Sequence, residues 1–322
     1  MNERFAALLG RVGGTLLVVV IIAIGLLVGA LGASVFAGFD LGPDADSEAV
    51  KAWVNARPFI PTTIGWLVAM PLLVLLGRQL FRIPMDAMGL RPAPTRRPRF
   101  VLGVLGGLAL ILVPALLARA LGGYAPMAEQ DIAALSVPSG SLAIGGIVYL
   151  LPALMIAALG EELLFRGLLL RFWEPVAGVK GALLLTALLF VVVHVGNPGS
   201  SPLGAIGVLL AGIWLGLVFV LHGDLWLAAG LHLGWNVSEA MVLGVPVSGH
   251  TLPALLRWEV SEGSTWQGLL GGSFGPEEGL LFHMALVVAI VITVLTRPLQ
   301  NPGLNDPGGP SVRSVDDAPA GS

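Results

Sequence analysis

The chain has 322 residues, of which 56% are hydrophobic and only 11% are charged, and its formal net charge at pH 7 is -3. An ordinary soluble domain is about a quarter charged, so a soluble chain of this composition would have too few polar side chains to cover its surface. The composition therefore predicts a membrane protein. The sequence contains no cysteine, which excludes disulfides, thiolate zinc ligands and cysteine nucleophiles.

Several apolar runs are long enough to cross a bilayer, because a spanning helix needs roughly 20 apolar residues. They predict an all-α bundle of about eight transmembrane helices within one domain, residues 1–300. The runs lie near residues 13–38, 58–81, 100–122, 141–172, 180–196, 203–221, 225–246 and 278–296. Residues 301–322 are rich in Pro, Gly, Asp and Ser, cannot bury a core, and are predicted to form a disordered tail.

The basic residues predict the orientation of the bundle, because Lys and Arg are retained on the cytoplasmic side of a membrane. With the N-terminus inside, all but four of the 17 Lys and Arg residues fall on the inner side. The four on the outer side are Lys51, Arg57, Arg119 and Arg257. We therefore expect both termini, and the tail 301–322, to be cytoplasmic.

Two adjacent carboxylates stand in the fourth apolar run, where an ionisable side chain is costly. Glu162 and Arg166 are four residues apart, which places them on one helix face and predicts an ion pair. Glu161 is rotated by about 100° from Glu162, so it cannot share that pairing geometry well. One carboxylate is thus left for chemistry. The alternative is a helix end that emerges into water.

Two further motifs follow in the next apolar runs. Phe190 and His194 lie in the fifth run, and a histidine there alone is as compatible with packing as with function. His232 and Asn236 are four residues apart in the seventh run, so their polar groups share one face. That pair could instead join helices by hydrogen bonds.

Other polar features of the sequence are assigned no role. His222 is predicted to lie in a turn, and His250 and His283 lack a polar partner at helical spacing. The Gly-rich segment from Glu262 to Gly279 is predicted to be a plain loop, with a mobile flap as the alternative.

The three motifs are expected to meet at one depth. At about 1.5 Å per residue, Glu161, His194 and His232 each fall in the central zone of a hydrocarbon core roughly 30 Å thick. A carboxylate beside an imidazole can hold and deprotonate a water, and a second imidazole with an amide can donate to an oxyanion. This combination suits amide hydrolysis.

The ordered set of motifs resembles a known family. Glu161-Glu162-x-x-x-Arg166, then Phe190-x-x-x-His194, then His232-x-x-x-Asn236 is similar to the CAAX protease and bacteriocin-processing family, also called the Abi family. The resemblance covers the middle of the chain, a motif core at residues 141–246. It implies an intramembrane endopeptidase that opens toward the cytoplasm.

The resemblance also implies residue roles. Glu161 would be the general base, His194 would position the water, and His232 with Asn236 would stabilise the oxyanion. Glu162, Arg166 and Phe190 would support them. Members of the family have been described both as metalloproteases and as glutamate proteases, so zinc held by Glu161, His194 and His232 remains open.

The predicted partners are a membrane-associated protein or peptide substrate and the lipid bilayer, with no nucleic acid. The short loops suit a multi-pass protein of a bacterial plasma membrane. Two other functions stay open: a catalytically silent scaffold or immunity protein of the same fold, and a proton-coupled transporter, since buried Glu, His and Arg also mark proton pathways.

Overall fold

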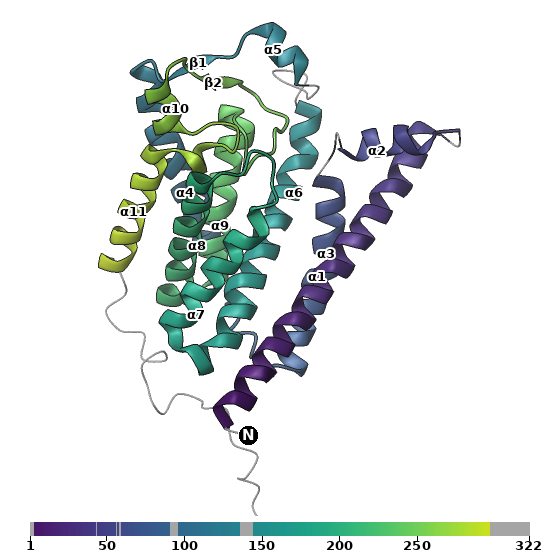
Figure 1. Ribbon diagram of the computed structural model, residues 1–322, viewed down its shortest axis with the longest axis vertical. Helices are drawn as coiled ribbons and strands as arrows, with labels where there is room; N and C mark the ends of the chain where they lie inside the picture. Colours follow the sequence, from purple (N-terminus) through teal and green to yellow (C-terminus); the bar gives the residue numbers. More distant parts are fainter. Residues whose placement is uncertain are drawn as a thin grey trace, which may run out of the picture.

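The computed structural model describes residues 3–42, 44–55, 57, 59–90, 96–135 and 144–296. In this part of the chain, apolar helices run roughly along one axis, and two short strands lie at one end (Figure 1). The longer helices are α1 (Glu3–Leu41), α3 (Phe59–Gln79), α4 (Arg96–Ala120), α6 (Ile144–Glu162), α7 (Arg171–His194), α8 (Pro202–His222), α9 (Leu225–Val237) and α11 (Leu280–Leu295).

The predicted all-α fold is confirmed, and each of the eight apolar runs contains one of these helices. By length and composition, five helical segments of the described chain can cross a membrane: Ala6–Leu41, Phe59–Gln79, Arg96–Ala120, Gly146–His194 and Pro202–His222. The remaining two apolar helices, α9 and α11, are shorter. The number of spans therefore remains a prediction.

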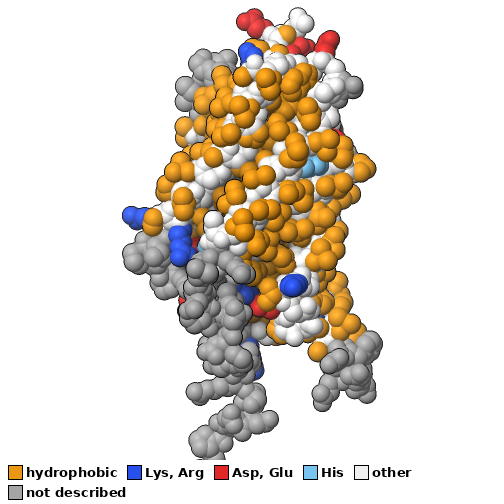
Figure 2. Space-filling model, turned by 90° about the vertical axis from the view of Figure 1, so that its left-hand side faces the viewer, with side chains coloured by type: hydrophobic (Ala, Val, Ile, Leu, Met, Phe, Trp, Pro, Cys, Tyr) orange, Lys and Arg blue, Asp and Glu red, His pale blue; other side chains and the backbone are white. Residues whose placement is uncertain are grey.

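The outer surface of the bundle is apolar over most of its height. Large aliphatic side chains are exposed on several helices, as at Leu16, Leu102 and Val192. In Figure 2 the middle of one face is covered by hydrophobic side chains, and charged side chains gather toward its two ends. A patch this large is unstable in water but matches a hydrocarbon environment. The chain is an integral membrane protein.

The long helical run Gly146–His194 holds the predicted fourth and fifth spans. As one straight helix its 49 residues would be about 74 Å long, more than twice a hydrocarbon core of roughly 30 Å. Gly178, with φ 68° and ψ 166°, breaks the helix inside α7. The chain reverses there, at the same end of the bundle as the start of α1 (Figure 1).

Glycine pairs bring α4 and α9 into close contact. Gly103 and Gly107 face Gly230 and Gly234, and a Cβ on any of them would collide with backbone atoms of the opposite helix. Spacing small residues four apart is how membrane helices bring their backbones together. His232 lies about 200° around α9 from Gly230, so this packing turns its side chain toward the rest of the bundle.

The turn between α8 and α9 is formed by Gly223 and Asp224, as predicted, whereas His222 is the last residue of α8 and does not lie in the turn. Gly223 adopts the left-handed conformation with φ 60°, and Asp224 caps α9 by accepting hydrogen bonds from the backbone N–H groups of Trp226 and Leu227. Asp224 also forms an ion pair with Arg99 of α4, at 3.0 Å.

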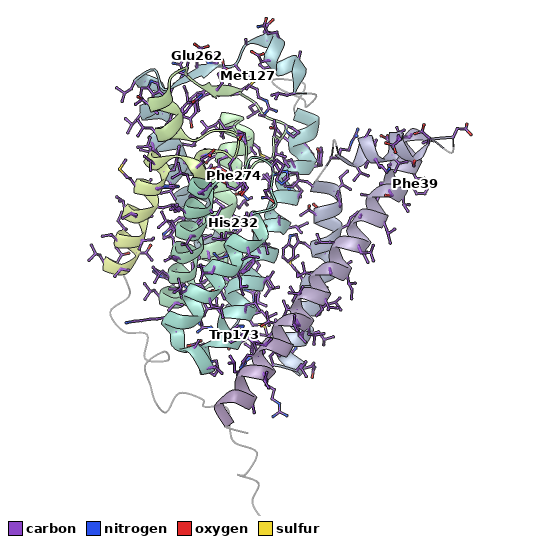
Figure 3. The ribbon with its side chains drawn as sticks, viewed as in Figure 1. Phe39, Met127, Trp173, His232, Glu262 and Phe274 are labelled. Carbon is purple, nitrogen blue, oxygen red and sulfur yellow. The ribbon has the colours of Figure 1, made fainter. Side chains whose placement is uncertain are left out.

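A small cap covers the end of the bundle opposite to this turn (Figure 1). It contains a two-stranded antiparallel sheet of β1 (Tyr124–Pro126) and β2 (Trp258–Val260), the helix α10 (Ser264–Leu270) and the 3-10 turn η4 (Pro276–Glu278). Two further short helices, α2 (Ser47–Asn55) and α5 (Glu129–Ala134), lie at this end. Figure 3 places Met127 and Glu262 here, Trp173 near the other end, and His232 and Phe274 between them.

The prediction of a plain loop from Glu262 to Gly279 is wrong. The segment contains α10 and η4, and Phe274 is buried in the core. The many glycines made the segment resemble a loop in the sequence, although large side chains such as Phe274 anchor it in the core. The tail 301–322 lies outside the described residues. α11 runs toward the end of the bundle at which α1 begins (Figure 1), and the cytoplasmic position of both termini stays a prediction.

Candidate active site

Glu162 and Arg166 form a buried ion pair. Arg166 Nη1 lies 3.0 Å from Glu162 Oε1, and the two side chains are 1% and 0% exposed. Arg166 also donates to the carbonyl oxygen of Gly212 in α8, and its guanidinium lies 4.7 Å from the ring centroid of Phe190. The segment η2 (Leu163–Leu170), which carries Arg166, is a π-helix, a form that often occurs at functional sites. The predicted ion pair is present.

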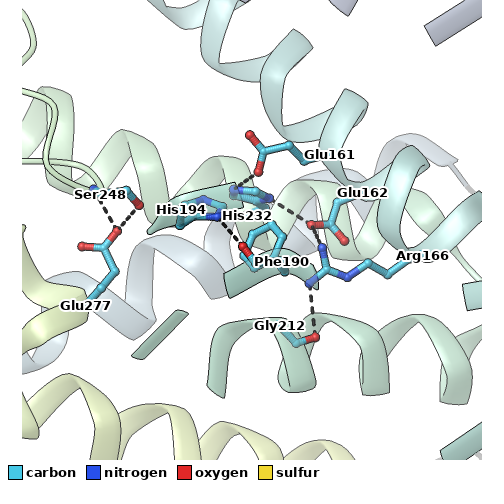
Figure 4. A network of polar contacts seen from close by, with 9 residues as sticks. All are labelled: Glu161, Glu162, Arg166, Phe190, His194, Gly212, His232, Ser248 and Glu277. Atoms are coloured by element: carbon cyan, nitrogen blue, oxygen red, sulfur yellow. Dashed lines mark hydrogen bonds and ion pairs between the residues drawn. The ribbon is translucent and has the colours of Figure 1, made fainter. Parts of the chain in front are cut away.

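His232 lies between the two adjacent carboxylates (Figure 4). Its Nδ1 is 2.9 Å from Glu162 Oε1, and its Nε2 is 3.8 Å from Glu161 Oε2. A carboxylate accepts and cannot donate, so Nδ1 carries the proton in the contact with Glu162. That bond fixes the ring and turns Nε2 toward Glu161. Glu161 Oε2 is buried and has no hydrogen-bond partner among the described residues.

His194 ends α7 beside the same group. Its Nδ1 donates to the carbonyl oxygen of Phe190, at 2.7 Å, and the two rings lie 4.4 Å apart. Phe190 also meets the His232 ring edge to face, with centroids 6.3 Å apart. Since Nδ1 of His194 carries its proton, its Nε2 is an acceptor. Phe190 thus packs between the two histidines and the Arg166 guanidinium.

These side chains line a cavity of about 330 Å³. Glu161, His194, His232 and Asn236 share its wall with apolar side chains of α1 and α3, among them Ile22, Leu26 and Trp66. A second, smaller cavity of about 40 Å³ lies beside it, and His194, His232 and Asn236 line both. The four residues predicted to be catalytic are therefore brought to one place, from three helices.

The candidate zinc ligands do not form a metal site in this geometry. Among the residues the structure describes, no three His, Asp or Glu side chains converge closely enough to hold a metal ion. Both histidines do direct Nδ1 to an oxygen, which leaves Nε2 as the outward nitrogen. Glu161, His194 and His232 therefore do not converge on one coordination point in this structure.

Three polar residues of the site were missed in the sequence. Ser248 and Glu277 line the small cavity, and Ser248 and His250 line the large one. His250 has no polar neighbour at helical spacing, and Ser248 and Glu277 lie in turns outside the apolar runs. No hydrophobic periodicity in the sequence marks these three residues, because they lie outside regular helices. Only the folded position of the cap brings them to the site.

Glu239 is another buried carboxylate that was missed in the sequence, although it lines neither cavity. It lies in the predicted seventh span, three residues after Asn236, within the short π-helix η3 (Ser238–Leu243), and it is fully buried. A carboxylate in an apolar run is itself a signal. Glu239 therefore stands out in the sequence for the same reason as Glu161, because both are carboxylates within an apolar run.

Burial acts on two of these groups outside the spanning helices. Desolvation raises the pKa of Glu277 to about 7, against the opposing effect of its hydrogen bonds to Ser248. Desolvation also lowers the pKa of His250, with a smaller contribution from the neighbouring His194. Glu277 can therefore exchange a proton near neutral pH.

The arrangement supports hydrolysis of a carbonyl compound. One carboxylate, Glu162, is occupied by Arg166 and His232, and the other, Glu161, faces a cavity large enough for several waters and part of a substrate. Two imidazoles and one amide face the same cavity. A base and hydrogen-bond donors thus lie within one enclosed volume.

Residues 143–238 match the family model described as type II CAAX prenyl endopeptidase Rce1-like. The match covers less than a third of the chain, and it includes the helices that carry Glu161, His194, His232 and Asn236. The chain therefore carries an Rce1-like domain, which confirms the resemblance to the CAAX proteases. No curated protein and no solved structure matches the chain.

Proposed function

We propose that this protein is an intramembrane endopeptidase that uses a glutamate-activated water. Glu161 accepts a proton from a water held between its carboxylate and His194 Nε2, and the resulting hydroxide attacks the scissile carbonyl. The proton then passes from Glu161 to the leaving amine as the C–N bond breaks. Glu161 acts first as general base and then as general acid.

Two groups of α9 stabilise the oxyanion in this proposal. His232 acts as an imidazolium, with Nδ1–H donated to Glu162 and Nε2–H available to the substrate oxygen, and the Asn236 amide is the second donor. A single donor of this kind is typically worth about 10²–10³ in rate. Glu162 and Arg166 position His232, and Phe190 packs against both histidine rings.

One observation carries the proposal: Glu161 keeps a buried carboxylate oxygen unpartnered among the described residues, at the wall of the cavity that both histidines line. An unsatisfied buried carboxylate is costly and is tolerated where it has a function. Glu162 is held differently, because its Oε1 accepts hydrogen bonds from both Arg166 and His232, whereas the nearest charged neighbour of Glu161, His232 Nε2, is 3.8 Å away.

The substrate we propose is a membrane-associated protein or peptide. Part of the cavity wall is formed by apolar side chains of α1 and α3, including Leu26 and Trp66. We further propose that the protein resides in a bacterial plasma membrane with its Arg-rich end, near Arg78 and Arg96, in the cytoplasm. This orientation follows from the retention of positive charge on the inner side.

The test is cleavage of peptides by the purified protein in lipid nanodiscs. Prenylated peptides that end in a CAAX sequence are compared with unprenylated ones, and further candidates come from membrane proteomes of cells with and without the protein. Wild type, Glu161→Gln and His194→Ala are compared with Glu278→Gln. Glu278 lies outside the cavity that holds Glu161 and accepts a hydrogen bond from the backbone of Gly272.

We expect wild type and Glu278→Gln to cleave, and the other two variants to lose at least 10²-fold in rate while they remain folded. Loss of cleavage with a chelator and its return with Zn²⁺ would favour the metalloprotease alternative. If all four proteins bind a substrate and none cleaves it, the chain is a scaffold. If none binds any of the peptides, neither the peptidase nor the scaffold is supported, and the proton-coupled transporter is the alternative that is left.

A further inference from the structure

A turn from the cap forms one wall of the candidate active site. Val247 and His250 pair through two backbone hydrogen bonds, so residues 247–250 make a tight turn. Three of its residues, Val247, Ser248 and His250, line the large cavity with Glu161 and His194. This turn lies beyond residue 238, where the family match ends.

The turn is strained and has to be held from outside. Ser248 has φ 44°, in the left-handed region that a residue other than glycine adopts only at a cost. Gly249 follows with φ 87°, and a Cβ there would collide with the carbonyl oxygen of Pro198. A conformation of this kind persists only when its surroundings impose it.

Glu277 holds the turn through two hydrogen bonds to Ser248. Its Oε1 accepts hydrogen bonds from the Ser248 backbone N–H, at 3.0 Å, and from the Ser248 hydroxyl, at 2.7 Å (Figure 4). The same segment fixes the next residue, because Gly249 N–H donates to the carbonyl oxygen of Phe274. On the other side, the Asn197 amide donates to the Ser248 carbonyl oxygen.

Glu277 is itself rigidly placed. Its side chain is 4% exposed, and its carbonyl oxygen lies 2.8 Å from His283 Nε2, in the first turns of α11. Its backbone also rests against Gly207 of α8, where a Cβ would collide with the Glu277 carbonyl oxygen. α8 and α11 therefore fix the carboxylate, and the carboxylate fixes the turn.

We propose that Glu277 is a positioning residue that clamps the 247–250 turn against the active-site cavity and so sets the width of the substrate cleft. The inference rests on the proposed peptidase function for its consequence, and on the contacts of Ser248 for its geometry. The η4 turn of the cap, outside the family domain, thereby controls access to a site built by α6, α7 and α9. Substrates with a bulky group beside the scissile bond would meet this wall.

The clamp can be tested without activity, since the chain has no cysteine. A single reporter, Val247→Cys, is introduced at a side chain that is 7% exposed, and its rate of reaction with a neutral maleimide is measured in nanodiscs. The same reporter is combined with Glu277→Ala, Glu277→Gln, Ser248→Ala and, as matched control, Glu278→Gln. Glu278 is the neighbouring carboxylate and bonds Gly272 instead of the turn.

We expect labelling to accelerate roughly tenfold or more with Glu277→Ala, and less with Ser248→Ala, which keeps the bond from the backbone N–H. The effect of Glu277→Gln should be smallest, because its amide oxygen can still accept both hydrogen bonds. Glu278→Gln leaves the rate unchanged. If Glu277→Ala does not fold, the two milder variants give the answer. Equal labelling in all the folded proteins would overturn the proposal.

Cleavage kinetics then separate this inference from the proposed function. With peptides graded in size beside the scissile bond, Glu277→Ala and Ser248→Ala should lower the KM for bulky substrates more than the KM for small ones. Faster labelling in a protein that cleaves nothing would support the clamp and reject the peptidase proposal. An unchanged size preference in an active Glu277→Ala or Ser248→Ala protein would reject the clamp as a determinant of specificity.

Discussion

Replacement of Arg166 by methionine is expected to destabilise the protein strongly. The guanidinium pairs with Glu162 at 3.0 Å, in a place where both side chains are almost completely buried. Arg166→Met keeps a long apolar stem of similar volume and removes only the charge and the donors. The carboxylate of Glu162 would then be buried without its cation.

The magnitude follows from burial. Removal of one partner of a buried ion pair costs about 3–5 kcal/mol, because it leaves an uncompensated charge in a medium of low dielectric constant. His232 still donates to Glu162, so we expect the lower end, about 3 kcal/mol. At roughly 2–4 °C per kcal/mol, the Tm should fall by on the order of 10 °C.

A double variant separates charge from packing. Glu162→Gln with Arg166→Met removes both charges and keeps an amide oxygen that can accept from His232, so its unfolding free energy should return to within about 1–2 kcal/mol of wild type. Peptidase activity should not return, because His232 no longer has an anionic partner. Thermal unfolding in detergent, followed by helical circular dichroism, measures the first effect, and peptide cleavage measures the second.

Either of two results would contradict this prediction. A cost of less than about 1 kcal/mol for Arg166→Met would mean that water or another group compensates Glu162. A double variant no more stable than the single one would mean that the loss comes from packing against Phe190 and from the bond to Gly212.

Three further predictions follow from the same contacts. Glu161→Gln should change the unfolding free energy by less than about 1 kcal/mol, since its nearest charged neighbour is 3.8 Å away, and a loss of several kcal/mol on thermal unfolding would instead make Glu161 structural. Burial raises the pKa of Glu277 to about 7, from an ordinary value of 4.5 in the unfolded state, so the folded state binds this proton more tightly. The contribution of Glu277 to the unfolding free energy should therefore be fully present below about pH 4.5 and should fall by about 3 kcal/mol as pH rises to 7 and above. Glu277→Gln should flatten that profile, measured as Tm against pH, and an unchanged slope would assign it to other groups. Gly207→Ala should lower the Tm markedly, because its Cβ would collide with the Glu277 carbonyl oxygen, whereas Gly10→Ala, with open space around it, should not.

The sequence alone predicted the lipid environment, the helical fold class and most residues of the candidate active site. Apolar runs of about 20 residues must pair their own backbone groups in lipid, and helices do this within each run. Few ionisable residues remain in those runs, and each is energetically costly to bury in lipid, so each is a candidate for a functional role. Glu162 and Arg166, four residues apart, had to share a face, and Glu161 had to point elsewhere.

Tertiary structure decided what helical spacing cannot express. The contact of His232 with both Glu161 and Glu162 joins helices 70 residues apart in sequence, and it depends on the close approach of α4 and α9 at their glycines. The break at Gly178, with its positive φ, sets where one long helical run becomes two. Spacing along the chain predicts neighbours on one helix and says nothing of distances between helices.

Ser248, His250 and Glu277 show the same limit most clearly. They lie in turns without period, two of them next to glycines, and the sequence there reads as a loop. They lie at the site because large side chains such as Phe274 pack into the core and anchor the cap against the bundle. The catalytic candidates were therefore predictable, since lipid makes buried charge expensive, whereas the wall that confines their substrate was decided only when the cap folded over them.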